Sequence, residues 1–163
     1  MRTVRLRVWF ATEDPHRDFQ RVADFGLFPS LAEDVRAVAV HPAPSPDVQR
    51  DSDWAVNFRR GVMRWNEWES VDEARLRIEF DQTEGDFAEF HGFWQLMPVP
   101  GGCEVLFEVS YDFGIESLAG IMDPIAERVV KRVICSVLSG LFGDIHVLEG
   151  GEALVDLAGM AQR

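Results

Sequence analysis

The sequence predicts an α+β fold in which a curved antiparallel sheet packs against one long helix near the C-terminus. Two patterns lead to this prediction. Apolar and polar side chains alternate along most of residues 33–113, as in antiparallel strands with one buried face. After residue 124 the apolar spacing becomes helical. The chain has 163 residues, which is the size of a single domain.

The first third of the chain predicts one strand followed by two short helices. Alternating apolar residues place a strand over residues 3–11. Asp14 and Pro15 then predict a helix that runs to about Ala23, with Asp14 as N-cap and the proline in the first turn. A second, shorter helical turn is expected around Pro29.

Six further strands are expected, joined by short turns into an antiparallel meander. They cover residues 35–40, 54–60, 62–71, 75–83, 87–97 and 103–113, so the predicted sheet has seven strands. The final helix is expected to begin at Asp123 and Pro124, which act as its N-cap and first turn, and to continue for about five turns. Residues 1–148 form one predicted domain, and residues 149–163 form a C-terminal tail.

Composition and charge argue against several classes of protein. Acidic residues outnumber basic ones by 28 to 16, and the formal net charge is −12. Such a charge repels a phosphate backbone, so nucleic acid is not an expected partner. Neither a leader peptide nor a membrane span is expected, and the cytoplasm is the predicted location. The 4 histidines and 2 cysteines lack ligand spacing, so neither a metal nor another cofactor is expected.

One face of the predicted sheet is rich in aromatic residues. Alternation places on this inner face Trp54, Val56, Phe58, Met63, Trp65, Leu76, Ile78, Phe80, Phe90, Gly92, Trp94, Leu96, Val105, Phe107, Val109, Tyr111 and Phe113. Such rings either simply fill the core or line a pocket for a planar hydrophobic ligand. We predict a pocket whose ligand-binding residues are Trp54, Phe58, Trp65, Phe80, Gln82, Phe90, Trp94 and Phe107. Gly92 is expected to leave room for a ligand or a bulge.

Three polar residues on that face are candidate catalytic groups. Glu67 and Glu69 share the alternation of Trp65 and should project inward, where burial would raise a carboxyl pKa and suit it to act as general base or acid. A twist or bulge near the strand end would instead bring them to solvent. Tyr111 could donate to an enolate oxygen or simply bond to the backbone. Gln82 could bind a ligand carbonyl or Glu67, and residues 51–53 are interpreted as a solvated acidic rim.

The sequence resembles the START-like superfamily with the helix-grip fold, and within it the polyketide cyclase and coenzyme-Q-binding branch. The resemblance extends to about residue 145. It is carried by four segments, which are Met63-Arg64-Trp65-Asn66-Glu67, Gln82-Thr83-Glu84-Gly85-Asp86-Phe87, Gly92-Phe93-Trp94 and Met122-Asp123-Pro124-Ile125-Ala126-Glu127-Arg128-Val129. The implied fold is a curved antiparallel sheet wrapped around a long C-terminal helix, with residues 1–148 as a ligand-binding domain.

The resemblance implies a polyketide cyclase or aromatase that binds a poly-β-ketone or an aromatic polyketide and promotes its cyclisation and dehydration by acid–base catalysis. The similar aromatase/cyclases carry a serine and an arginine where this chain has Glu67 and Glu69. Because carboxylates do not stabilise an enolate, the oxyanion would need Tyr111, Gln82 or an arginine such as Arg60.

Two other classes of function remain open from the sequence. One is a non-catalytic carrier or sensor of a quinone, lipid or polyketide product. The other is an interaction module whose aromatic face is fully packed. The expected partner is a hydrophobic or aromatic small molecule, and an acyl carrier protein and a second copy of the chain are left open as further partners.

Overall fold

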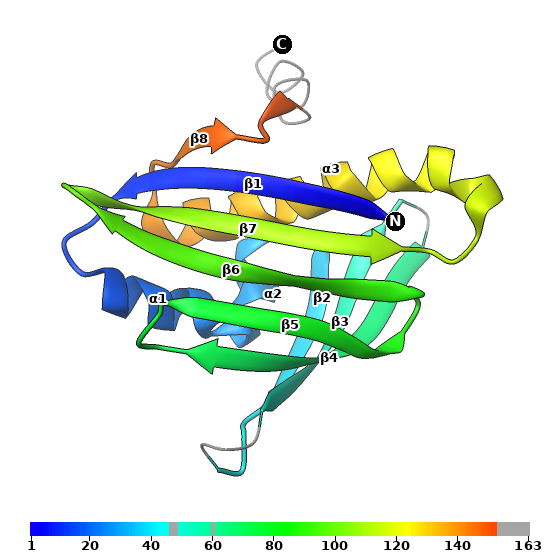
Figure 1. Cartoon of the computed structure of the whole chain (residues 1–163), viewed down its shortest axis with the longest axis horizontal. Coiled ribbons are helices and arrows are strands. Elements are labelled where there is room, and N and C mark those ends of the chain that lie inside the picture. Colours follow the sequence, from blue (N-terminus) through cyan, green and yellow to red (C-terminus); the bar gives the residue numbers. More distant parts are fainter. Residues whose placement is uncertain (46–48, 60, 153–163) are drawn as a thin grey trace.

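The computed structural model describes residues 1–45, 49–59 and 61–152. The α+β prediction is confirmed, because an antiparallel sheet curves around the long helix α3 (Glu116–Phe142), as Figure 1 shows. In sheet order the strands are β2 (Val35–His41), β3 (Arg50–Phe58), β4 (Gly61–Asp72), β5 (Arg77–Gly85), β6 (Glu89–Val99), β7 (Gly102–Asp112), β1 (Arg2–Ala11) and β8 (His146–Glu149).

The sheet has eight strands, so the prediction of seven is wrong by one. The additional strand, β8, pairs antiparallel with β1 after α3 has ended. All four of its residues are exposed, so it has no alternation of buried and exposed side chains to reveal it. The predicted boundary between residues 148 and 149 falls inside this strand, and residues 153–163 of the predicted tail lie outside the described residues.

The predicted first helix is confirmed as α1 (Pro15–Ala23). Its N-cap is Asp14, whose side chain accepts a hydrogen bond from the Arg17 backbone N–H at 3.2 Å. The second helical turn is a 3₁₀ segment, η1 (Phe25–Leu27), followed by the short helix α2 (Phe28–Leu31). These segments bury Phe25 and Phe28 against the inner face of the sheet.

Helix α3 starts at Glu116, earlier than the sequence predicts, so Pro124 lies inside the helix and not in its first turn. Proline removes one backbone N–H and so deprives the carbonyl of Gly120 of its helical partner. Gly120 is exposed, which leaves that carbonyl to water at little cost. The far end of the helix is held against the sheet by Phe142, whose ring stacks on Phe10 of β1 with a centroid distance of 4.0 Å.

Strand β3 also starts earlier, at Arg50 instead of Trp54. The other strand ends match the prediction to within about two residues. The earlier start makes Asp51, Ser52 and Asp53 part of the strand, so their side chains alternate between its two faces. Ser52 is fully buried, and its interpretation as part of a solvated acidic rim is wrong.

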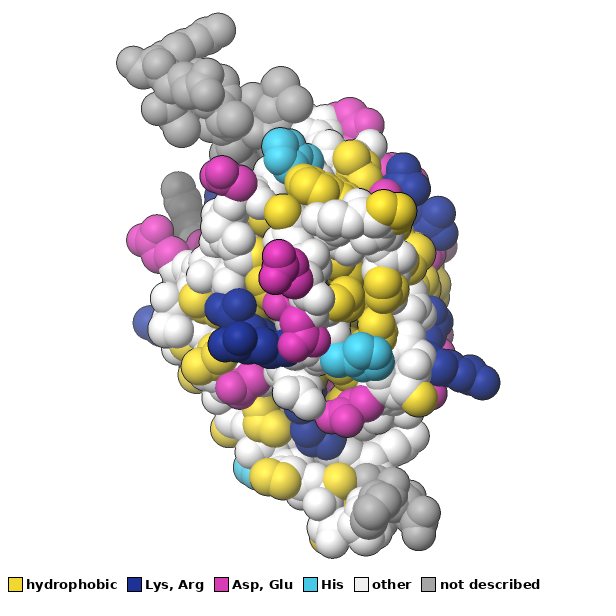
Figure 2. Space-filling model, turned by 90° about the vertical axis from the view of Figure 1, so that its left-hand side faces the viewer, with side chains coloured by type: hydrophobic (Ala, Val, Ile, Leu, Met, Phe, Trp, Pro, Cys, Tyr) yellow, Lys and Arg dark blue, Asp and Glu magenta, His cyan; other side chains and the backbone are white. Residues whose placement is uncertain are grey.

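Figure 2 shows the face of the molecule that lies on the left-hand side of Figure 1, and this face is mixed in charge. Acidic and basic side chains are interspersed there with apolar ones, so the negative net charge does not gather into one patch on this face. None of the helices in the described part of the chain combines the length and the apolar character that spanning a bilayer requires.

Gly92 on β6 has a packing role that the sequence did not predict. A Cβ atom at this position would lie 2.0 Å from the Glu108 carbonyl oxygen of β7 and 2.8 Å from the Phe80 ring. The space beside Gly92 is therefore already filled by the neighbouring strand and by an aromatic ring. Glycine here permits a close approach of two strands and does not leave room for a ligand.

We predict that Gly92→Ala lowers the free energy of unfolding by about 1–3 kcal/mol or more, because the added methyl group must displace backbone. Gly61→Ala is the matched control, since a Cβ at Gly61 meets nothing within 4 Å. Urea denaturation measures both. Equal stabilities of the two variants would contradict the close packing described at Gly92.

Candidate functional site

A cavity of about 80 Å³ lies between the concave face of the sheet, α3 and the short helices. A single water molecule requires roughly 10–15 Å³ of such space, so the cavity has room for a group of ligand atoms. Its wall consists of Phe25, Phe28, Trp54, Val56, Phe58, Met63, Trp65, Glu67, Phe80, Phe87, Phe90, Trp94, Phe107, Ala126, Val129, Val130, Val133 and Ile134.

The wall has an aromatic side and an aliphatic side. The sheet and the short helices contribute the rings, among which Trp54 and Trp65 are stacked with centroids 5.6 Å apart. Helix α3 contributes only alanine, valine and isoleucine. A flat ligand would therefore contact ring faces on one side and a smooth aliphatic surface on the other, which suits a planar hydrophobic molecule.

Four residues of the cavity wall are only half-buried. They are Trp54 on β3, Met63 near the start of β4, Phe87 in the β5–β6 turn and Val130 on α3. A ligand that needs more room than this cavity offers requires wall side chains to move, and the partly exposed ones are the least enclosed.

Glu67 is the one ionisable side chain among the described residues of the wall. It is 3% exposed and accepts a hydrogen bond from the Trp65 indole N–H at 2.8 Å. Burial raises its pKa well above the usual value, and the hydrogen bond and charge of Glu69 raise it further. The indole N–H and Arg50 oppose this rise without cancelling it. The protonated form of this carboxyl is therefore favoured to a higher pH than in an ordinary glutamate.

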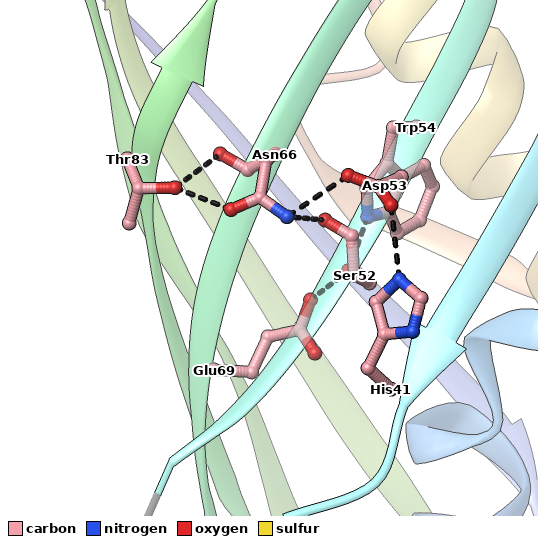
Figure 3. A network of polar contacts seen from close by, with 7 residues as sticks. All are labelled: His41, Ser52, Asp53, Trp54, Asn66, Glu69 and Thr83. Atoms are coloured by element: carbon pink, nitrogen blue, oxygen red, sulfur yellow. Dashed lines mark hydrogen bonds and ion pairs between the residues drawn. The ribbon is translucent and has the colours of Figure 1, made fainter.

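Glu69 is buried too, but it does not line the cavity. Its carboxylate accepts a hydrogen bond from Arg50 Nε at 2.7 Å and another from the Ser52 hydroxyl. Figure 3 shows Ser52 between Glu69 and Trp54, whose indole N–H donates to the Ser52 oxygen at 2.7 Å. Hydrogen bonds therefore connect the Glu69 ion pair to an aromatic ring of the cavity wall.

Arg50 is held from three directions. Besides Glu69, it donates from Nη1 to the Ala23 carbonyl at the end of α1, at 2.7 Å. Its guanidinium carbon lies 4.7 Å from the centre of the Phe25 ring, which forms part of the cavity wall. Arg50 thereby ties β3, β4 and the short helices together behind the cavity.

A register shift in the sheet lies beside Glu67. The pairing of β4 with β5 shifts between Asn66 and Glu67, and Thr83 is the extra residue on β5. The Thr83 hydroxyl donates to the Asn66 side chain on the outer face, as Figure 3 shows. The bulge does not bring Glu67 or Glu69 to solvent, since both are buried.

Two of the predicted polar site residues are engaged elsewhere. The Gln82 side chain donates to the Phe87 carbonyl at 2.9 Å and accepts from the Phe87 N–H, so it closes the β5–β6 turn. The Tyr111 hydroxyl donates to the Asp123 carbonyl of α3 at 2.7 Å, and burial raises the pKa of this tyrosine. Neither lines the cavity. The side chain of Arg60 lies outside the described residues.

The other predicted ligand-binding residues all lie in the cavity wall. They are Trp54, Phe58, Trp65, Phe80, Phe90, Trp94 and Phe107. Three aromatic residues of the wall were missed as ligand-binding residues, namely Phe25, Phe28 and Phe87, and so were Arg50 and Ser52 behind it. Ser52 and Arg50 continue the alternation of Trp54, Val56 and Phe58 toward the start of the strand. Extending the predicted strand to residue 50 would have placed both side chains on the inner face.

A curved antiparallel sheet around one long helix, with an apolar cavity between them, defines the helix-grip class of ligand-binding domains. Residues 14–138 match the family described as polyketide cyclase / dehydrase and lipid transport. The chain belongs to this family, which confirms the resemblance seen in the sequence, and its members bind hydrophobic small molecules. A comparison with curated proteins finds no match.

Solved structures share the fold. TTHA0849 from Thermus thermophilus has a TM-score of 0.75 at 24% identity, with 86% of this chain and 94% of that one covered. The Zhui aromatase/cyclase from Streptomyces sp. R1128 has a TM-score of 0.66 at 17% identity, with 96% and 95% covered. A START superfamily protein from Mycobacterium smegmatis has a TM-score of 0.68 at 12% identity, with 85% and 93% covered.

The raised pKa of Glu67 predicts how stability depends on pH. The unfolded chain releases this proton near the usual pKa of 4.5, whereas the folded protein retains it. The folded state binds more protons, so the Glu67 contribution to stability falls as pH rises above about 4.5, by up to about 1.4 kcal/mol per pH unit. Glu67→Gln lacks this dependence. Urea denaturation of both proteins at pH 5–7 should show wild type losing stability relative to the variant, and a constant difference would contradict the shift.

The Arg50–Glu69 pair predicts a large effect of removing one partner. Arg50→Met should cost about 3–5 kcal/mol of stability, because it leaves a buried carboxylate without its cation. Arg77→Met is a closely matched control, since Arg77 also pairs with a glutamate on its own sheet and lies 4.1 Å from the Phe93 ring centre. Arg77 is half-buried and its partner Glu79 is exposed, so the loss of this pair should cost less than about 1 kcal/mol. Similar costs for both variants would contradict the distinction.

Proposed function

We propose that the protein is a polyketide cyclase or aromatase that binds a poly-β-ketone or an aromatic polyketide in the cavity, with Glu67 as the general acid and base. The observation that carries this proposal is the single buried carboxylic acid in an otherwise apolar, aromatic wall. Family membership supports the general kind of chemistry.

The proton transfers follow from the resting state of Glu67. In the aldol step, Glu67 gives its proton to the carbonyl oxygen under attack, a carbon–carbon bond forms, and the proton lost by the enol nucleophile returns to Glu67. In the dehydration step, Glu67 protonates the departing hydroxyl and then takes a proton from the neighbouring carbon. Water leaves, a double bond forms and the carboxylic acid is restored.

An acid is the appropriate group in this cavity. The described part of the wall offers no arginine to stabilise an enolate, and the Tyr111 hydroxyl and the Gln82 amide are bonded to backbone groups. Protonating the carbonyl oxygen as it is attacked avoids a free oxyanion and removes the need for those groups.

A carrier of a hydrophobic ligand is the second candidate. The absence of a second polar group from the described residues of the wall favours it, because binding needs only apolar surface and one donor. An acyl carrier protein and a second copy of the chain stay predictions as partners.

Replacing Glu67 separates the two candidates. We expect Glu67→Gln to reduce formation of the cyclised, dehydrated product by roughly 10²–10⁴-fold, since glutamine cannot transfer protons, while affinity for an aromatic ketone is retained. The assay is chromatographic product analysis with a poly-β-ketone supplied by a polyketide synthase. The control is Glu79→Gln, at an exposed carboxylate of β5. Unchanged product formation by the Glu67 variant would reject catalysis and leave the carrier.

A further inference from the structure

Glu67 and Glu69 are two buried carboxyl groups on one strand face with unequal surroundings. Glu69 is met by the Arg50 guanidinium and the Ser52 hydroxyl. Glu67 is met by the uncharged Trp65 N–H and by the free space of the cavity. The hydrogen-bond donors that favour a negative charge therefore surround Glu69. Among the described residues, the cavity wall near Glu67 contains no charged donor.

The charges around Glu67 and Glu69 permit only one of the two to be a carboxylate. A surface groove lies next to Glu69, and Arg50 is the only cation in its described wall, which also includes Asp24 and Glu73. On β5, Gln82 stands opposite Glu67 and Phe80 opposite Glu69. Helix α3 brings no titratable side chain to the cavity wall. One cation balances one buried carboxylate, and a second negative charge would remain uncompensated in an apolar region.

We propose that Glu67 and Glu69 hold one proton between them, with the charge on Glu69 and the proton on Glu67, and that the cavity therefore selects neutral ligands that carry a hydrogen-bond-accepting oxygen and rejects carboxylates. Burial and the neighbouring Glu69 both raise the pKa of Glu67, in agreement with this distribution.

The proposal narrows the class of ligand. A ketone or quinone oxygen accepts a hydrogen bond from the Glu67 acid without any change in charge. A fatty acid or an aromatic carboxylate would bring a second anion next to Glu69, into a wall that contains no cation among its described residues. The ligand-class part rests on the proposed use of the cavity as the ligand site, whereas the shared proton does not.

Two measurements on the intact protein test the two parts. Infrared spectroscopy at pH 7.5 should show the carbonyl band of a protonated carboxylic acid, and Glu67→Gln should abolish it because Glu69 stays ionised against Arg50. Glu79→Gln, at an exposed carboxylate, should retain the band. Calorimetric titration of wild type with 2-acetylnaphthalene and with 2-naphthoate, which share one ring system, should show the carboxylate binding about tenfold more weakly or worse.

Each outcome bears on a separate claim. Absence of the band from wild type, or its persistence in Glu67→Gln, overturns the assigned proton. Equal affinity for ketone and carboxylate overturns the selectivity and leaves the cavity as a ligand site. If neither compound binds, the selectivity is overturned together with the proposed function, while the infrared result still decides the shared proton. Loss of the band in Glu67→Gln with preferential ketone binding supports the whole proposal.

Discussion

The ion pair between Arg50 and Glu69 is the constraint on which the site depends. Two carboxyl groups on the inner face of a sheet would normally oppose folding, because each must leave water. Arg50 and Ser52 donate hydrogen bonds to one of them, Glu69, and burial beside it raises the pKa of the other, Glu67. Arg50 also contacts the end of α1 and a ring of the cavity wall. The same side chain therefore compensates a charge and positions the elements that enclose the cavity.

The cavity exists because its two walls differ in chemistry. Large rings projecting from a curved sheet cannot fill the space beside a helix whose inward residues are small or β-branched. The Phe80 ring lies against Gly92, and Tyr111 attaches α3 to the sheet through the Asp123 carbonyl. These contacts set the separation of the walls and leave one acidic group facing the space between them.

Family membership and the particular residues of this chain carry different information. The family description covers both cyclase/dehydrase chemistry and lipid transport, so membership leaves a choice. The resemblance seen in the sequence implies that aromatase/cyclases carry a serine and an arginine at the positions of Glu67 and Glu69. Two glutamates cannot perform the electrostatic role of that arginine. In the function proposed above, Glu67 instead transfers protons, and the cavity is proposed to favour neutral ligands.

The sequence by itself determined the order of the elements as far as α3, the inward face of most strands and the aromatic character of the cavity, because alternation along a strand is a local property. It also placed Glu67 and Glu69 on that face. Only the tertiary structure decided that Glu67 faces the cavity while Glu69 faces Arg50. It also decided that Tyr111 and Gln82 form hydrogen bonds to backbone groups. Phe25 and Phe28 complete the wall only because the short helices pack against the sheet. Those outcomes depend on which strands and helices meet across the sheet, and on charge balance in a buried space, neither of which is encoded in the period of a single strand.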